Sequence, residues 1–141
     1  MITYYTDGSC SPNPGPGGFA VIKEMKPCVL GGEPDKSETT NIRMEGLALV
    51  AALEDSAGEE AVIYTDSEFW INVVTKWAPS WREKGWKKKS GPIKNLDIVK
   101  KLVDLYEQNN AELRWVKGHE GDPGNEMADE YANKARAGER R

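Results

Sequence analysis

The chain has 141 residues, 38% of them hydrophobic and 30% charged, which is typical of a globular protein and excludes a chain that is disordered throughout. No apolar run approaches the roughly 18 residues of a membrane span, and no leader peptide is evident, so we expect a cytoplasmic protein without membrane contact. The length predicts one domain over residues 1–141, a monomer, with a frayed tail at about 138–141. Cys10 and Cys28 fit no metal-binding spacing and are interpreted as reduced thiols.

The first third of the chain predicts three strands. Alternating β-prone residues over 2–6 indicate the first strand, and a turn rich in glycine and proline follows over 8–18. Residues 19–25 and 27–31 have the composition of a second and a third strand, which we expect to form a meander with the first.

Helices and strands alternate in the remainder. A helix capped by Thr40 or Asn41 is predicted because apolar residues recur at helical spacing after it. The elements expected next are a strand over 61–65, a helix over 67–77 that Pro79 ends, a helix around 96–106, a strand over 111–116 and a helix over 125–137. This order predicts an α/β fold with a mixed sheet, in which reactive groups gather beyond the carboxyl ends of strands.

Four carboxylates come from four separate predicted elements. Asp7 closes the first strand and Asp66 the fourth, so the two lie side by side if these strands are neighbours. Glu45 lies at the start of a helix, and Asp129 lies one turn into the last helix. Each has an ordinary structural interpretation, as a turn former or as a charge in a first helical turn. If they converge, they repel one another, and hard divalent cations such as Mg²⁺ relieve that repulsion.

Charge is divided unevenly along the chain. The net charge is −4, but residues 76–101 hold nine cations against two acids, a net +7 that leaves −11 for the remainder. Trp77, Trp81 and Trp86 lie among these cations. The segment is either a solvated helix face with core tryptophans, or a nucleic-acid grip that pairs cations with phosphates and flat rings with sugars or bases.

Several blocks, in order and over almost the whole chain, resemble the type I ribonuclease H family, including members with a basic protrusion. They are TDGSC at 6–10, PNPGPGG at 12–18, TNIRME at 40–45, YTDS at 64–67, WVKGH at 115–119, and GNE at 124–126 continuing to AD at 128–129. The resemblance implies a ribonuclease H-like fold, with a five-stranded mixed sheet of order 3-2-1-4-5 flanked by helices.

The resemblance also implies an activity. It implies an endonuclease that hydrolyses the RNA strand of RNA–DNA hybrids with 5′-phosphate and 3′-hydroxyl products, using Mg²⁺, or Mn²⁺ as the alternative ion, with two ions once substrate is bound. Asp7 would bridge both ions, Asp66 would bind the ion that activates water, and Glu45 and Asp129 would hold the ion on the leaving-group side. His119, the only histidine, is either a surface or packing residue or the family's mobile histidine, which assists proton transfer or product release near the metals.

Hybrid-binding residues are also implied by the resemblance. They are Asn13, Thr40, Asn41, Trp81, Lys84, Trp86, Lys87, Lys88 and Lys89. In these roles Asn13 and Asn41 lie near the minor groove, Thr40 meets a DNA phosphate together with Lys84, and the basic segment grips the DNA strand. Ile42 and Glu68 depart from commoner family patterns near the expected hybrid surface.

Two alternatives keep the fold but change the activity: a strand transferase, and a hybrid-binding module without catalysis. The short chain argues against the first, and the presence of all four carboxylates argues against the second. A reductase or kinase lacks support, since there is neither a dinucleotide-binding nor a Walker fingerprint.

Overall fold

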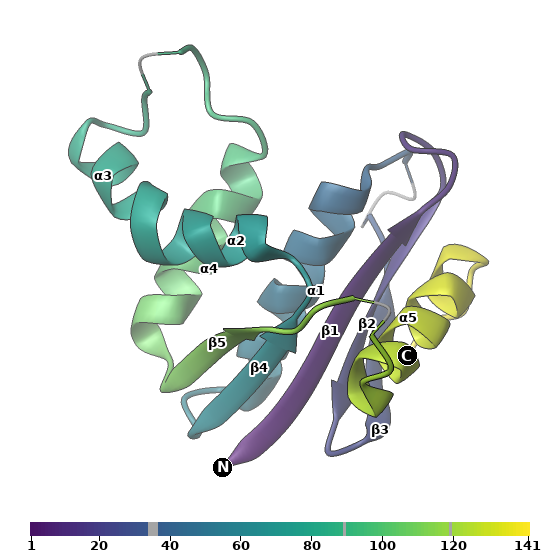
Figure 1. Ribbon diagram of the computed structural model, residues 1–141. Helices are drawn as coiled ribbons and strands as arrows, with labels where there is room; N and C mark the ends of the chain where they lie inside the picture. Colours follow the sequence, from purple (N-terminus) through teal and green to yellow (C-terminus); the bar gives the residue numbers. More distant parts are fainter. Residues whose placement is uncertain (34–36, 89, 119) are drawn as a thin grey trace.

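The computed structural model describes residues 1–33, 37–88, 90–118 and 120–141 and has an α/β fold built on one five-stranded sheet (Figure 1). The strands are β1 Ile2–Cys10, β2 Gly17–Lys23, β3 Lys26–Gly31, β4 Ala61–Thr65 and β5 Ala111–Trp115, in the order β3-β2-β1-β4-β5. The first three strands form an antiparallel meander, whereas β1, β4 and β5 are parallel. The expected five-stranded mixed sheet of order 3-2-1-4-5 is confirmed.

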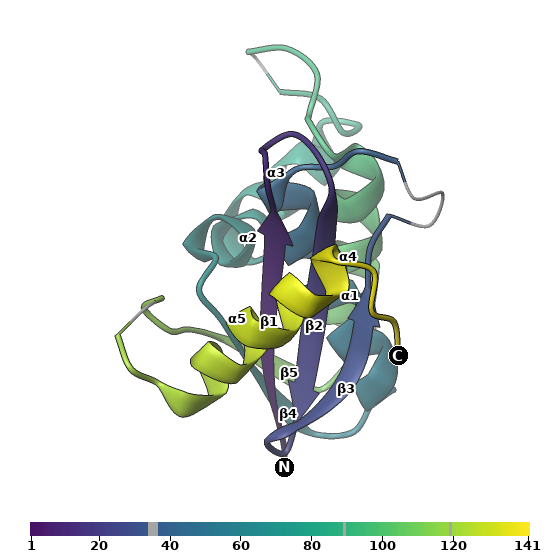
Figure 2. The ribbon, with the colours of Figure 1, turned by 90° about the vertical axis from the view of Figure 1, so that its right-hand side faces the viewer.

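Helices cover both faces of the sheet. They are α1 Asn41–Ser56, α2 Glu68–Asn72, the π-helical turn η1 Val73–Trp77, α3 Ala78–Glu83, α4 Leu96–Gln108 and α5 Pro123–Arg136. Figure 2 shows α5 alone in front of β1 and β2, with α1 and α4 behind the sheet. The main core lies on the α1 side, where Leu49, Leu53 and Trp70 are fully buried. Among the described residues, no helix combines the length and the apolar character needed to cross a membrane.

Two local expectations need correction. The first strand does not end at Thr6 but continues to Cys10, because its second half still pairs with β2. Pro79 does not end the helix that precedes it. It lies in the first turn of α3, where a missing N–H is tolerated, and helical backbone runs through the π turn into α3.

The backbone of the C-terminal tail pairs with the sheet, while the fraying expected at about 138–141 stays a prediction. The backbone of Arg141 exchanges two hydrogen bonds with Leu30 of the edge strand β3, at 3.1 and 3.3 Å. Arg140 also donates through Nη1 to the carbonyl of Ala135, at 2.6 Å. The hydrogen bonds with Leu30 satisfy groups of an edge strand that would otherwise face solvent unpaired.

Candidate active site

The sheet register places Asp7 beside Asp66. β1 and β4 pair in parallel up to the partners Thr6 and Thr65, so the two aspartates are the next residues on adjacent strands. Both backbones reach the same end of the sheet, as expected for neighbouring parallel strands. The predicted convergence of these two carboxylates is therefore a direct consequence of strand order.

Glu45 joins them because α1 approaches β1 very closely. Thr40 caps α1, since its hydroxyl accepts from the Arg43 N–H at 3.2 Å, and this fixes where the helix begins. A Cβ on Gly8 would lie only 2.5 Å from the backbone nitrogen of Glu45, so only glycine permits this contact. The first turn of α1 thus lies against the residue that follows Asp7.

Three of the four predicted carboxylates form a compact group. Asp7, Glu45 and Asp66 each offer an oxygen, and these atoms lie within 4.8 Å of one another. Asp129 is not part of that group, but its charge acts on Asp7 from α5 and raises the pKa of that aspartate. The structure therefore brings together the acids from β1, α1 and the end of β4, while the acid of α5 lies outside this group.

The electrostatics of the group favour binding of a cation. Burial, reinforced by the nearby charge of Asp66, raises the pKa of Asp7 to about 9, although the Gly8 N–H donates to its carboxylate at 2.9 Å. Burial and the Asp66 charge raise the pKa of Glu45 to about 7, while a hydrogen bond with Ser67 opposes the shift. Crowded, partly buried oxygen donors of like charge are the ligand set that a hard divalent cation relieves, so these residues fit such an ion.

His119 and Lys89 lie outside the described residues. The chain next to His119 is described, and it runs close to the acidic group: a Cβ on Gly118 would lie 3.0 Å from Oδ2 of Asp66. Asp122 then caps α5 by accepting from the Asn125 N–H at 3.0 Å. The histidine prediction therefore stays a prediction.

Asn13, Thr40 and Asn41 come together at the tip of the β1–β2 turn. The side-chain oxygen of Asn13 accepts from the Asn41 N–H at 3.3 Å. Asn13 and Thr40 line one hollow of about 600 Å³, together with Ile42, Lys94 and Asn95. Lys94 also lines this hollow, and the role expected for Lys84 at a DNA phosphate stays a prediction.

The basic segment combines cations with aromatic rings, as predicted. The Lys88 ammonium lies 5.9 Å from the Trp81 ring centroid, and Lys100 lies 5.7 Å from that of Trp86. Both rings are half-buried, and the Trp86 N–H donates to the Trp81 carbonyl at 2.7 Å. Lys84 and Lys87 are exposed. The two interpretations of this segment thus coexist, since rings that support the fold also border the cations.

Sequence reasoning missed part of this surface. A second hollow, of about 230 Å³, is lined mainly by apolar residues and includes Phe69, Trp77, Trp81 and Lys88. Phe69 and Trp77 are over 40% exposed and their rings lie 6.0 Å apart, edge to face. An aromatic residue directly after Asp66-Ser67-Glu68 was the available signal. Ile42 lines both hollows, and Glu68 is exposed in the first turn of α2.

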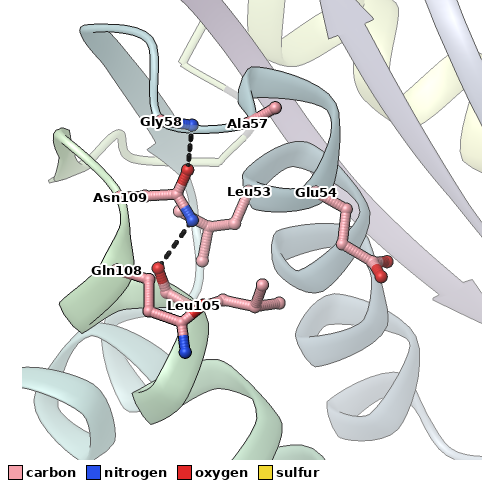
Figure 3. A pocket seen from close by; sticks show the side chains of 7 residues that line it. All are labelled: Leu53, Glu54, Ala57, Gly58, Leu105, Gln108 and Asn109. Atoms are coloured by element: carbon pink, nitrogen blue, oxygen red, sulfur yellow. Dashed lines mark hydrogen bonds between the residues drawn. The ribbon is translucent and has the colours of Figure 1, made fainter.

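A further hollow is remote from the acids. It lies between the C-terminal ends of α1 and α4, where Asn109 accepts from the Gly58 N–H at 2.6 Å and donates to the Leu105 carbonyl at 2.7 Å (Figure 3). Ala57, at its rim, follows Glu45 by twelve residues, which corresponds to about 18 Å of helix. This hollow is therefore no part of the site at the acidic group.

Comparisons with known proteins agree with the geometry. The family model described as RNase H matches residues 1–137. Ribonuclease H of Maricaulis maris is 44% identical over 96% of this chain and 93% of its own length, and ribonuclease H of Alcanivorax borkumensis is 42% identical over 94% and 89%. The crystal structure of LC9-RNase H1, described as a type 1 RNase H with the type 2 active-site motif, is 30% identical, with a TM-score of 0.84 over 99% of this chain and 74% of that one. From its sequence, its fold and these relatives, the chain belongs to the RNase H family and is an endoribonuclease of type I.

Proposed function

We propose that this protein cleaves the RNA strand of RNA–DNA hybrids by metal-dependent attack of water, leaving 5′-phosphate and 3′-hydroxyl ends. The observation that carries the proposal is the meeting of Asp7, Glu45 and Asp66 within 4.8 Å, from three elements far apart in sequence. The family membership supplies the substrate class, and the acidic group supplies a reason for the chemistry.

The four acids would hold divalent ions, Mg²⁺ or in its place Mn²⁺, with two ions present once substrate is bound. Asp7 would contact both ions, Asp66 the ion on the side of the attacking water, and Glu45 and Asp129 the other. A bound pair of such ions supplies an activated water and neutralises charge on the attacked phosphate. Asp129, which lies outside the tight group, would complete the site from α5.

Protein groups orient the acids for this task. The Gly8 N–H holds one oxygen of Asp7, and Ser67 holds Glu45. The Trp115 indole N–H donates to the carbonyl of Asp66 at 3.3 Å, which ties β5 to the end of β4. We further propose that His119 moves a proton near the leaving group, a role that suits an imidazole with a pKa near neutrality.

Hybrid binding is proposed for the surface that runs from the basic segment to the hollow at Thr40. Trp81, Trp86 and the lysines at 84 and 87–89 would follow the DNA strand, while Asn13, Thr40 and Asn41 lie at the opposite end. Lys94 joins this set on the basis of its position in the hollow. Cations beside flat rings suit a strand with phosphates on one side and sugars on the other.

A cleavage assay tests the proposal. RNA labelled at its 5′ end is offered as a hybrid, as a single strand and as duplex RNA, with Mg²⁺ or with EDTA, and product ends are identified by ligation and phosphatase treatment. We expect cutting of the hybrid alone, only with the ion, and none by Asp66→Asn. Asp104→Asn, a change at an exposed acid of α4, is the matched control and should cut normally. Cleavage in EDTA, equal cutting of all substrates, or binding without cleavage would contradict the proposal.

A further inference from the structure

A pocket at the far end of α5 differs from the surface described so far. It has a volume of about 260 Å³, and its lining includes Gly17, Ser37, Arg136 and Arg140. It lies where the C-terminal end of α5 meets the start of β2 and the segment after β3 (Figure 2). Residues 134–141 hold four cations and one acid, so this end of the chain is a second cationic region on an otherwise acidic protein.

Neutral groups, not carboxylates, hold the two arginines of the pocket. Arg136 donates through Nη1 to the Ser9 hydroxyl at 2.8 Å, and that hydroxyl donates to the Asn133 side chain at 2.7 Å. Arg140 donates to the Ala135 carbonyl at 2.6 Å. Within the described part of the chain, neither arginine forms an ion pair with a carboxylate.

The pocket is shaped to hold these groups in place. A Cβ on Gly32 would lie 2.8 Å from Nη2 of Arg140, so the guanidinium occupies space that a larger residue would take. Glu33, an acid in the lining, is held by Arg43 through both of its oxygens, at 3.0 and 3.1 Å, and Arg43 is shared with Asp97. Two fixed guanidinium groups around a small pocket are a suitable receptor for the oxygens of a phosphate.

The position of Arg136 connects the pocket with the acidic group. Arg136 follows Asp129 by seven residues, which places it on the same face of α5, two turns or about 10 Å further along. Its partner Ser9 follows Asp7 by two residues and lies on the same face of β1. Both α5 and β1 therefore lead from the acids to this pocket.

We propose that Arg136 and Arg140 bind a backbone phosphate of the cleaved strand, beyond the nucleotide that is cut. This inference rests on the proposed function and adds a contact to it: the strand would be held by this pocket as well as by the hollow at Thr40 and the basic segment. Sequence reasoning did not find this phosphate contact, because the two arginines have the pattern of ordinary cations at a helix C-terminus.

The test compares single substitutions on hybrids of different length. Arg136→Gln and Arg140→Gln are measured beside Arg141→Gln, which makes the same charge change at a residue already paired with Glu139 at 3.9 Å. On long hybrids we expect KM to rise about fivefold for the first two, with kcat unchanged, and the slope of log KM against log salt to fall by about 0.9. Arg136→Lys should recover part of the loss, because it keeps the charge.

Substrate truncation identifies the contact. Hybrids are shortened on either side of the cleavage site. Shortening on the side that reaches the pocket should remove the difference in KM between Arg136→Gln and wild type, whereas shortening on the other side should leave that difference. Inorganic phosphate, at up to about 50-fold the concentration of the hybrid, is added as a competitor that tests for binding of the free ion. Inhibition by phosphate that is equal in wild type and variant would contradict the site. Unchanged KM and salt slope in both Gln variants, or a KM that rises equally in Arg141→Gln, would overturn the inference. If wild-type protein fails to cut hybrids at all, the proposed function fails instead, so the two failures are distinguishable.

Discussion

Replacing Asp7 by Asn should abolish cleavage and at the same time stabilise the metal-free protein. The side chain keeps its size, and its oxygen still accepts from the Gly8 N–H at 2.9 Å. What disappears is a buried carboxyl group that cannot ionise in the folded protein without facing the charges of Asp66, Asp129 and Glu45. A substitution that destroys function yet increases stability would show that the acidic group is maintained for chemistry.

The magnitude follows from the pKa of Asp7, which rises from 3.8 to about 9 on folding. A raised pKa means that the folded protein holds a proton which the unfolded chain has released, so its stability is full below pH 3.8 and declines up to about pH 9. At pH 7 the decline extends over about three pH units, each worth about 1.4 kcal/mol, which gives about 4 kcal/mol as the upper value. Because the group can relax toward solvent, we expect about 2–4 kcal/mol of stabilisation at pH 7 and almost none at pH 3.

Urea unfolding in EDTA is followed by circular dichroism at about pH 3, 5, 7 and 9. It measures the difference in free energy of unfolding between wild type and Asp7→Asn. Asp55→Asn is the matched control of opposite sign: the Tyr4 hydroxyl at 2.6 Å and Lys23 at 3.1 Å hold the pKa of Asp55 below its usual value, so its loss should destabilise. Added Mg²⁺ should narrow the gap between wild type and Asp7→Asn by stabilising wild type alone. The reasoning would be refuted if Asp7→Asn were no more stable than wild type at pH 7, or if the difference between them did not change with pH.

Three further outcomes are expected. Gly8→Ala should lower stability by about 2 kcal/mol or more and reduce cleavage strongly, since its Cβ would lie 2.5 Å from the Glu45 nitrogen; a stable, active variant by urea unfolding and hybrid assay would show that α1 can move. Replacing the lysines at 87–89 by Ala should raise KM and lower the salt slope by up to about 2.7, measured on one hybrid from low to high salt; an unchanged slope would remove them from the binding surface. His119→Ala should slow turnover and leave residual cleavage in single-turnover kinetics, and either full activity or none would count against proton transfer.

The parts of the site that sequence could predict are those set by local pattern plus strand order. Asp7 and Asp66 end the paired stretch of adjacent parallel strands, so their proximity follows once the order is known. Glu45 was predictable because the Thr40 cap fixes the start of α1. The role of Asp129 stays a prediction, because the axis of α5 across the sheet decides its distance from the other acids and no local signal encodes that axis.

Other features depend on contacts between distant segments. The pairing of Arg141 with Leu30 joins the chain end to an edge strand, and nothing in the tail sequence distinguishes it from a frayed end. Lys94 reaches the hollow at Thr40 because the loop before α4 folds back toward α1, where Arg43 donates to Asn95, and no local pattern encodes that contact. Pro79 was read as a break because the π turn before it, which lets helical backbone continue, has no sequence signature.

The backbone holds the three carboxylates of the acidic group close together, so that they repel one another. This repulsion is the reason why the group would bind a cation. Gly8 lets α1 lie against β1. Gly46 lets the Trp70 ring lie so close to α1 that a Cβ on residue 46 would be 2.7 Å from the ring. Trp70 in turn donates through its indole N–H to the Ile42 carbonyl at 2.7 Å, which fixes the first turn of α1 against α2. Flexible acids on a surface separate when their charges repel, but these are carried by elements whose main chains and buried rings are in direct contact. The metal-free protein relieves the repulsion by keeping a proton on Asp7, whose pKa is about 9, whereas a bound divalent ion would relieve it with the carboxylates ionised and the fold unchanged.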